Sequence, residues 1–273
     1  MDDFFVKLFS KQPKEIIEND YFFDADNEGD NFDENDEDRW LNQGIFKANW
    51  EGKRQGRGDV FKLCDEIGDK IAGGGKAFME IACGPGMGLS PVILAKNPKI
   101  PCLATDACSR LIKAWRYYIN QNLTEHNINL ASFSVLDMPI KNNSFDYVTS
   151  FIGIGSTRNG MEGQIKALKE VLRILKPGGF FVTIEGEFED LAKVDEVFKQ
   201  WGKHNWYNDT SWVTPWRDKF ISAGFEIAGE DRYYSRKWDK DSNDFGEAAE
   251  KFNIEVCMKY KLYILRKVNL RGN

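Results

Sequence analysis

The chain is poor in the residues that build disulfide frameworks and metal sites. Its 273 residues include five cysteines and only two histidines. No two cysteines form a CxxC pair, whereas a zinc site needs closely spaced pairs of cysteine or histidine. We therefore predict free thiols in a reducing compartment and no metal centre. The cysteines are Cys64, Cys83, Cys102, Cys108 and Cys257.

Long apolar runs are also missing. The run Phe180–Ile184 is one of the longest, and a membrane-spanning helix needs about 20 apolar residues. The start, Met1-Asp2-Asp3, has no basic region followed by an apolar stretch, so we expect no signal peptide. These absences predict a protein outside the membrane, located in the cytoplasm.

An excess of positive charge is the third absence. The chain has 37 Lys and Arg against 43 Asp and Glu, a formal net charge of −6. Binding to nucleic acid needs a clustered basic surface, and Arg54 and Arg57 offer only a small basic patch. The composition therefore argues against a nucleic-acid partner. It indicates no particular oligomeric state.

Apolar periodicity divides the chain into alternating helices and strands. Helical spacing is found in residues 60–71, 89–96, 111–119 and 165–175. Short apolar strands are predicted at 77–83, 102–105, 131–136, 145–151 and 180–184. Strands that alternate with single helices indicate crossover connections and a parallel sheet with helices on both faces. We predict a doubly wound α/β fold, with almost continuously apolar strands because both faces are buried.

Two regions fall outside this alternation. Residues 1–56 read as irregular and are expected to form an N-terminal cap or lid, leaving 57–273 as the main domain. An aromatic-rich insertion is expected at about 200–250; its rings either pack into a core or close over a small ligand. The acidic tract 20–38 begins like a calcium loop at Asp24. However, its twelfth position is Asn35 where such loops need glutamate, so we predict a solvated acidic loop.

A glycine loop stands where the first strand of the main domain turns into a helix. Its sequence is Cys83-Gly84-Pro85-Gly86-Met87-Gly88. Glycines permit positive φ and close approach of the backbone to a ligand. In doubly wound sheets, ligands bind at this carboxyl edge of the strands. A tight turn without a ligand would explain the glycines equally well if they stood alone.

Three acidic residues near strand ends favour a ligand. Asp106 ends the second strand, 20 residues after Gly86, where a carboxylate can accept hydrogen bonds from ribose hydroxyls. Glu80 precedes the loop, and Asp137 is expected to end the third strand. A single acid there is usually a helix cap, but three on one sheet edge are harder to explain that way.

The same acids help to choose the ligand. A pyrophosphate favours a helix N-terminus without acids nearby, and Leu89 stands where a dinucleotide fingerprint has its third glycine. A ligand with ribose hydroxyls, an ammonium group and no phosphate fits better. S-adenosylmethionine has these features.

The run Glu80-Ile81-Ala82-Cys83-Gly84-Pro85-Gly86-Met87-Gly88 resembles the first motif of class I S-adenosylmethionine-dependent methyltransferases. Three later segments, beginning at Asp137, Asn143 and Leu172, are similar to further segments of that family in the same order. The resemblance covers about residues 57–187. It implies a Rossmann-like methyltransferase fold, with a mostly parallel seven-stranded sheet, and S-adenosylmethionine as cofactor.

The resemblance also implies roles for single residues. The loop side, which would hold the methionine end of the cofactor, comprises Glu80, Ala82, Cys83, Gly84 and Gly86. Ala82 departs from the family, which most often has glycine there.

On the nucleoside side, Asp106 would bind the ribose and Ala107 would lie against the adenine. Asp137 would meet the adenine amino group, Met138 would add backbone and apolar contact, and Phe151 would wall the site near the sulfonium. No general base is evident in residues 152–159, so no catalytic residue is assigned.

The leading hypothesis is transfer of a methyl group to a small-molecule acceptor, by alignment and desolvation in a capped site. Two alternatives remain open. One is a catalytically silent protein that holds the nucleoside as a ligand or scaffold. The other is a nicotinamide-dependent oxidoreductase, which Leu89 and the acids near the loop argue against.

Overall fold

The computed structural model describes residues 4–23, 41–54, 56–157, 159–203, 210–230, 232–240 and 244–268. Most of the acidic tract lies outside these ranges, including the calcium-like loop from Asp24. So do three aromatic residues of the predicted lid, which are Trp40, Trp206 and Tyr207.

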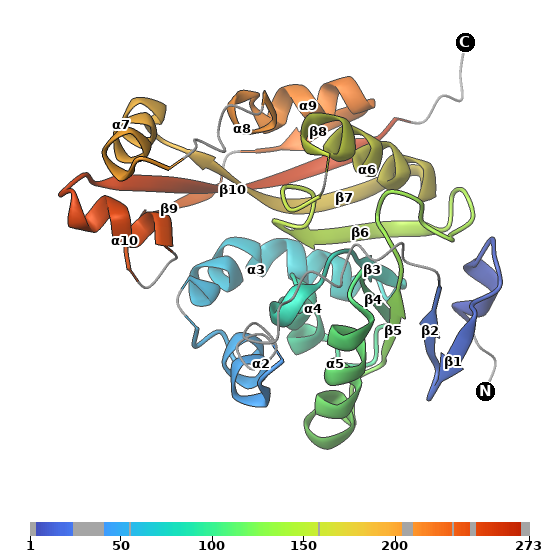
Figure 1. The fold of residues 1–273 in the computed structure, drawn as a ribbon. Coiled ribbons are helices and arrows are strands. Elements are labelled where there is room, and N and C mark those ends of the chain that lie inside the picture. The colour runs from blue at the N-terminus through green and yellow to red at the C-terminus, as the bar shows by residue number, and fades with distance from the viewer. Residues whose placement is uncertain are drawn as a thin grey trace, which may run out of the picture.

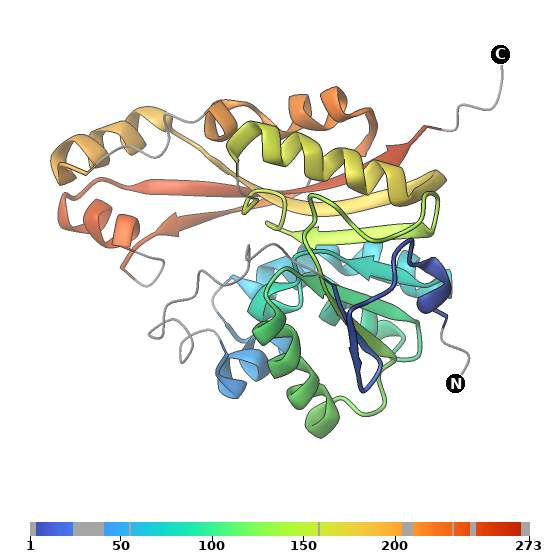
Figure 2. The ribbon, with the colours of Figure 1, turned by 45° about the vertical axis from the view of Figure 1, so that its right-hand side comes forward.

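The described residues form one ten-stranded sheet with helices on both faces (Figures 1 and 2). The strand order is β1-β2-β5-β4-β3-β6-β7-β10-β8, and β9 pairs with β10. The strands are β1 (Glu15–Ile17), β2 (Asp20–Phe22), β3 (Phe78–Glu80), β4 (Cys102–Asp106), β5 (Ile128–Ser132), β6 (Phe145–Phe151), β7 (Leu175–Phe188), β8 (Phe225–Gly229), β9 (Tyr233–Trp238) and β10 (Val256–Lys267).

The helices are η1 (Val6–Leu8), α2 (Gln43–Trp50), α3 (Arg57–Gly73), η2 (Gly84–Gly86), α4 (Ser90–Lys96), α5 (Ser109–Asn122), α6 (Gly160–Ile174), α7 (Leu191–Trp201), α8 (Thr210–Val213), α9 (Trp216–Ala223) and α10 (Asp244–Lys251). One buried cluster joins α3, α4 and α5 to one face of the sheet. A second cluster joins α6, α9 and the N-terminal segment to the other face.

The central strands confirm the predicted doubly wound fold. Strands β5, β4, β3, β6 and β7 are parallel neighbours. The order runs outward from β3 in one direction and from β6 in the other, so the topological switch point lies between these two strands. The crevice at such a point is where doubly wound sheets bind ligands.

The sheet has three strands more than the predicted seven. Strands β1 and β2 form an antiparallel pair, and β2 joins the sheet by parallel pairing with β5. Strand β9 pairs with the first half of β10, while β8 pairs with its last residues. Part of the N-terminal region read as irregular is therefore a sheet edge.

Strands β7 and β10 continue past the end of β6, whose last residue, Phe151, pairs with Ile184. We call the projecting part the overhang; it comprises residues 185–203, 232–240 and 244–261. In both views it carries β9, α7 and α10 (Figures 1 and 2). It has its own apolar cluster, which includes Val197, Phe198, Phe245 and Val256.

Among the described residues, none of the helices combines the length and the apolar character that a membrane span requires. Within the same ranges, no three His, Cys, Asp or Glu side chains come together in a way that could hold a metal ion.

Candidate functional site

The glycine loop leaves β3 in a run of left-handed backbone conformations. Ala82, Gly84 and Gly88 have φ angles of +48°, +53° and +52°. The alanine at the family's glycine position is accommodated by a neighbour, because a Cβ placed on Gly153 would lie 2.7 Å from the Ala82 Cβ. The missing side chain at Gly153 therefore provides the space that the Ala82 methyl group occupies.

Asp106 is bound directly to this loop. Its Oδ2 accepts a hydrogen bond of 2.9 Å from the Gly84 amide, and its Oδ1 accepts one of 3.0 Å from the Cys108 amide. Trp115 Nε1 donates to the Gly84 carbonyl at 2.9 Å. Burial raises the pKa of the Asp106 carboxyl above its ordinary value. Each carboxylate oxygen can still accept a further hydrogen bond from a ribose hydroxyl.

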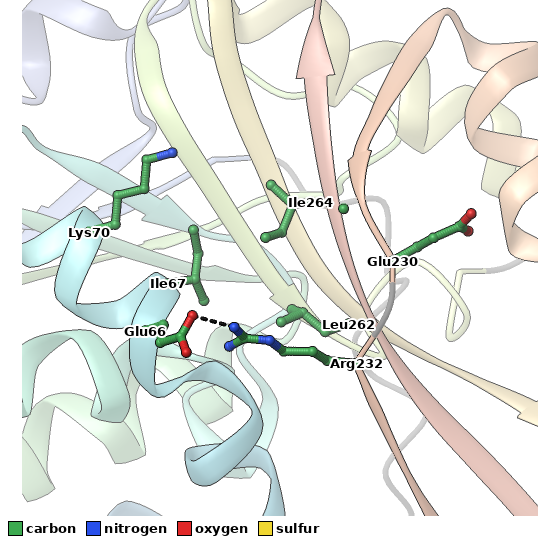
Figure 3. Close-up of a pocket in the computed structure, with 8 residues that line it drawn as sticks. Glu66, Ile67, Lys70, Glu230, Arg232, Leu262 and Ile264 are labelled. Atoms are coloured by element: carbon green, nitrogen blue, oxygen red, sulfur yellow. Dashed lines mark hydrogen bonds and ion pairs between the residues drawn. The ribbon is translucent and has the colours of Figure 1, made fainter.

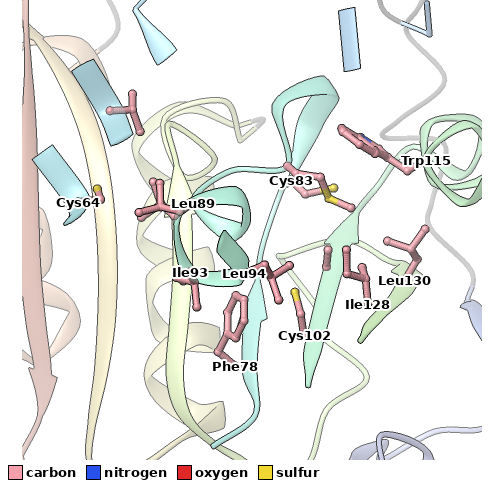
Figure 4. Close-up of a cluster of buried hydrophobic side chains, with 14 of the residues drawn as sticks. Cys64, Phe78, Cys83, Leu89, Ile93, Leu94, Cys102, Trp115, Ile128 and Leu130 are labelled. Atoms are coloured by element: carbon pink, nitrogen blue, oxygen red, sulfur yellow. The ribbon is translucent and has the colours of Figure 1, made fainter. Parts of the chain in front are cut away.

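Cys83 and Ala107 flank this contact. The Cys83 amide donates to the Thr105 carbonyl at 2.8 Å, and its thiol lies in the buried cluster around Trp115 and Leu89 (Figure 4). Burial raises the pKa of that thiol well above its ordinary value. Cys83 therefore contributes backbone to the loop, while its side chain belongs to the core. The Ala107 carbonyl accepts from Ser132 Oγ at 3.3 Å.

Glu80 lies behind the loop and is fully buried. Its Oε2 accepts from the Leu89 amide at 2.9 Å and from Thr149 Oγ1 at 2.6 Å. A Cβ on Gly88 would lie 1.8 Å from Glu80 Oε1, so only glycine fits there. Burial raises the pKa of Glu80 to about 8. This carboxyl group supports the loop and the start of α4, which has no side-chain cap of its own.

Arg57 of α3 is a site residue that sequence reasoning placed only in a small basic patch. Its Nη2 donates to the carbonyls of Gly86, at 2.8 Å, and Gly88, at 2.5 Å. The side chain is buried, and its guanidinium carbon lies 5.1 Å from the centre of the Phe151 ring. Helical spacing could have indicated this position, because Arg57 continues the buried stripe of Val60, Cys64 and Ile67.

Phe151, one of the predicted site residues, lies near the loop, because the Arg57 side chain contacts both the Phe151 ring and the loop carbonyls. Phe151 ends β6, and the next residue, Ile152, has a φ of +59°. The Ile152 amide donates to the Ile184 carbonyl at 2.8 Å. The crossover after β6 therefore turns sharply beside the glycine loop, and Gly153 contacts Ala82 across it.

Asp137 and Met138 are not brought to the loop. Strand β5 covers 128–132 and not the predicted 131–136, so Asp137 lies five residues beyond its end. Asp137 is exposed and forms an ion pair of 2.7 Å with Lys11. The Met138 amide donates to Glu170 Oε2 of α6 at 2.9 Å.

The residue beside Asp106 is instead Phe133. Its amide donates to the Asp106 carbonyl at 3.1 Å. Residues 133–136 therefore come directly after β5, and this segment begins beside Asp106. The sequence analysis expected Asp137 in that position.

A second buried carboxyl group, Glu185, lies next to the crossover after β6. Its Oε1 accepts from Thr183 Oγ1 at 3.0 Å. A Cβ on Gly155 would lie 3.2 Å from its Oε2. Burial raises the pKa of Glu185 to about 8, against the opposing charge of Lys219.

A pocket of about 290 Å³ lies elsewhere, between α3 and the strand β10. Figure 3 shows Glu66 and Arg232, which form an ion pair, facing each other at this pocket. Its lining comprises Glu66, Ile67, Lys70, Gly229, Glu230, Arg232, Leu262 and Ile264. None of the predicted cofactor residues lines it, so this pocket is separate from the loop and Asp106.

Comparison with known proteins agrees with this fold. Residues 79–183 match the family model of a methyltransferase domain. A demethylmenaquinone methyltransferase of Staphylococcus haemolyticus is 32% identical over 129 residues, covering 41% of this chain and 52% of that protein. One of Staphylococcus carnosus is 29% identical over 177 residues, covering 57% of this chain and 68% of that protein. The chain thus spans about half the length of the first of these relatives and about two thirds of the second.

Solved structures show the same fold at low sequence identity. The protein BH2331 of Bacillus halodurans has a TM-score of 0.52 and 18% identity, over 74% of this chain and 98% of that one. YcgJ of Bacillus subtilis has a TM-score of 0.51 and 16% identity, over 76% and 99% of the two chains.

The fold and the loop define a Rossmann-like nucleoside-binding domain. Residues 79–183 match a methyltransferase domain, in agreement with the predicted class I S-adenosylmethionine-dependent type. The comparisons confirm the predicted fold class, and for residues 79–183 the match to a methyltransferase domain supports the predicted family and cofactor.

Proposed function

We propose that the protein transfers the methyl group of S-adenosylmethionine to a small-molecule acceptor. The observation that carries this proposal is the direct bond between the glycine loop and Asp106, from the Gly84 amide to Oδ2 at 2.9 Å. It fixes a carboxylate beside a backbone turn at the switch point of the sheet. A nucleoside without phosphate suits this combination.

In this proposal the ribose hydroxyls bind Asp106, and the adenine lies over Ala107 and residues 133–136. The methionine end runs along the loop toward Gly86. The sulfonium then lies near Phe151, where β6 ends next to the loop. Glu80 acts from behind by holding the loop and the first turn of α4.

Methyl transfer is an in-line displacement whose leaving group needs no proton. The protein contributes alignment and exclusion of water, which for well-oriented reactants is worth about 7–11 kcal/mol. Phe151, Ile152 and Gly153 form an apolar wall there, and their side chains carry no titratable group. The acceptor therefore has to arrive with an available electron pair, or has to lose its proton to a group outside this wall.

We place the acceptor between this wall and the overhang, which acts as the cap. Tyr234 of β9 and Tyr260 of β10 stack with ring centres 5.0 Å apart. A Cβ on Gly56, next to Arg57, would lie 3.9 Å from the Tyr234 hydroxyl, so the stack adjoins the start of α3. In contrast, N-terminal aromatic residues such as Tyr21 and Phe46 are fully buried core residues.

The test is transfer of a labelled methyl group to a panel of small acceptors, including an analogue of demethylmenaquinone, on which the relatives act by their names. We expect transfer to at least one class of acceptor by the wild type. We also expect Asp106→Ala to lower that rate at least about 100-fold, because hydrogen bonds to a charged group are each worth about 1.5–3 kcal/mol. Tight cofactor binding without transfer to any acceptor would favour the silent nucleoside-binding alternative.

A further inference from the structure

Strand β9 turns one polar and aromatic face inward. Exposure alternates along the strand, as expected where successive side chains point to opposite faces of a sheet. The inward set is half-buried and consists of Tyr234, Arg236 and Trp238. Both aromatic members pack against the buried cluster that joins α3 to the sheet, and β9 itself lies beside α3 (Figure 1). This face therefore borders the region in which we place the acceptor.

Aromatic rings cover the inward face and its surroundings. The Tyr234 and Tyr260 rings stack with centres 5.0 Å apart and an interplanar angle of 14°. Trp238 Nε1 donates to the Tyr260 hydroxyl at 3.3 Å, and the Trp238 ring meets Phe188 edge to face at 5.2 Å. Phe151, at the end of β6, is half-buried and packs against the same cluster. Because aromatic rings prefer to stack on other rings, this surface favours a flat aromatic acceptor.

Two hydrogen-bond donors stand at one corner of this face, against Gly56. A Cβ on Gly56 would lie 3.4 Å from Arg236 Nη1 and 3.9 Å from the Tyr234 hydroxyl. Burial raises the pKa of Tyr234, so its hydroxyl stays a neutral donor at physiological pH. A guanidinium group has several N–H donors and can bind more than one acceptor. This corner is therefore suited to an oxygen that only accepts hydrogen bonds, such as a phenolate.

The charges around this corner include two cations and an opposing acid. Arg236 and Arg57 both act on Tyr234 in the sense that favours an anion, and Asp59 acts in the opposite sense. The Asp59 side chain is 55% exposed and lies 3.9 Å from Lys62 Nζ, so water screens its charge. Arg57, in contrast, is buried. The buried side of the corner is thus positive, and the acid lies on its exposed side.

An acceptor that arrives ionised needs no base from the protein. The apolar wall at Phe151, Ile152 and Gly153 offers none, and a phenol that has already lost its proton to solvent brings its own electron pair. The phenolate oxygen then forms a bond to the methyl carbon while the carbon–sulfur bond breaks and its electron pair goes to sulfur. The products are an aryl methyl ether and S-adenosylhomocysteine, and no proton moves in this step. A nearby cation favours the ionised form of the acceptor.

We propose that the acceptor is a phenol bound in its ionised form, with its oxygen held by Arg236 and Tyr234 and its ring against the aromatic face of the overhang. This inference rests on the proposed function and names the class of acceptor for the same site. Arg236 selects for the negative charge, and the stacked rings of Tyr234 and Tyr260 select for a flat molecule.

The test measures calorimetric binding of two ring probes to the complex of the protein with S-adenosylhomocysteine. One probe is para-nitrophenol, used at a pH where it is ionised, and the other is para-nitroanisole, the same ring with a methylated and uncharged oxygen. We expect wild type to bind the phenolate at least about tenfold more tightly than the anisole. Arg236→Gln should weaken phenolate binding about 10- to 100-fold and anisole binding less than about threefold. Absorbance of the bound phenolate gives a second measure, because wild type should shift the ionisation of the probe to lower pH and Arg236→Gln should not.

Lys237→Gln is the matched control. It removes a positive charge from the next residue of the same strand, whose side chain is exposed and lies 3.9 Å from Glu255. Both probes should bind this variant as they bind wild type.

An equal loss of affinity for both probes in Arg236→Gln would overturn the inference, since Arg236 would then only hold β9 in place. Equal affinities of wild type for the two probes would also overturn it, and this comparison decides the question if Arg236→Gln does not fold. So would failure of both probes to bind a wild-type protein that binds S-adenosylhomocysteine. Failure of folded wild type to bind S-adenosylhomocysteine would instead contradict the proposed function on which the inference rests.

Discussion

Ala82 and Gly153 show how single residues shape the cofactor loop. Ala82 adopts a left-handed conformation that glycine adopts without strain, and its methyl group lies against Gly153. The sequence motif showed that Ala82 was unusual, but it could not show which residue compensates, because Gly153 lies 71 positions away in sequence and comes near only through the pairing of β3 with β6.

Gly153→Ala is expected to destabilise the protein by about 1–3 kcal/mol, because its Cβ would overlap Ser150 Oγ and the Ala82 methyl group. Ala82→Gly should change stability by less than about 1 kcal/mol, since relief of strain offsets the added chain entropy. Denaturant unfolding of both variants and of the double variant gives their coupling. The account predicts that Ala82→Gly partly rescues Gly153→Ala, and strict additivity would contradict it.

Glu185 makes stability depend on pH. Burial raises its pKa to about 8 from an ordinary value of 4.5, so its contribution is complete below pH 4.5 and is lost as the pH rises through 8. Its surroundings are Thr183, the crossover at Ile154 and Gly155, and the charge of Lys219. Glu185→Gln should therefore gain stability relative to wild type between pH 5 and pH 9, by more than about 1 kcal/mol. Thermal unfolding across that range measures it, and a constant difference between the two proteins would disprove the assignment.

Residue identities in the candidate site were predictable only in part. The loop and Asp106 follow from glycine spacing and from a carboxylate at a strand end, and the structure joins them by a hydrogen bond. Asp137 shows the limit of this reasoning. Strand β5 ends at Ser132, earlier than its apolar pattern indicates, so Asp137 does not end the strand and instead forms an ion pair with Lys11. Arg57 was missed as a site residue because a charged side chain usually marks the exposed face of a helix.

At the scale of elements, the parallel core was predictable and the edges were not. Strand β6, for example, was predicted with its observed bounds, 145–151. The hairpin β1–β2 has strands of three residues each, too short to show a period of two. The end of β7 contains Glu185, Gly186 and Glu187, which read as a loop until the antiparallel pairing with β10 is known.

The N-terminal hairpin is tied to the sheet by a buried ion pair. Asp20 of β2 is 1% exposed and accepts two hydrogen bonds from Arg116 of α5, at 2.8 and 2.5 Å. Arg116→Ala leaves this carboxylate buried without its cation, so we expect a loss of about 3–5 kcal/mol in unfolding free energy. Tyr117→Ala, on the exposed side of the same helix, should cost less than about 0.5 kcal/mol. Equal effects of the two variants in chemical denaturation would mean that the hairpin is not part of the cooperative core.

On the scale of the whole molecule, the described residues combine the matched methyltransferase domain with the overhang. The glycine loop follows β3, and Asp106 ends β4. The overhang is formed by the parts of β7 and β10 that extend past the end of β6, together with the elements attached to them. The cluster of Phe198, Phe245 and Val256 holds the overhang together and contains no residue of the loop. Cofactor binding and the packing of the overhang should therefore be separable.

Phe245→Ala, which empties a buried ring position, should cost about 3–5 kcal/mol of stability. At a temperature where the variant is folded, its affinity for S-adenosylhomocysteine should stay within about threefold of wild type, while its methyl transfer should fall because the cap is loosened. Calorimetry and the transfer assay separate the two effects. A matching loss of cofactor affinity would show that the overhang forms part of the cofactor site.

The central claim is that the loop from Ala82 to Gly88 and the Asp106 carboxylate together bind the nucleoside of S-adenosylmethionine. Calorimetric titration of S-adenosylhomocysteine into wild type, Asp106→Ala and Asp137→Ala tests it most directly. The account predicts one site per chain in the wild type, at least about 100-fold weaker binding in Asp106→Ala, and unchanged binding in Asp137→Ala, whose side chain pairs with Lys11. No heat of binding in the folded wild type, or equal affinities in all three proteins, would contradict it.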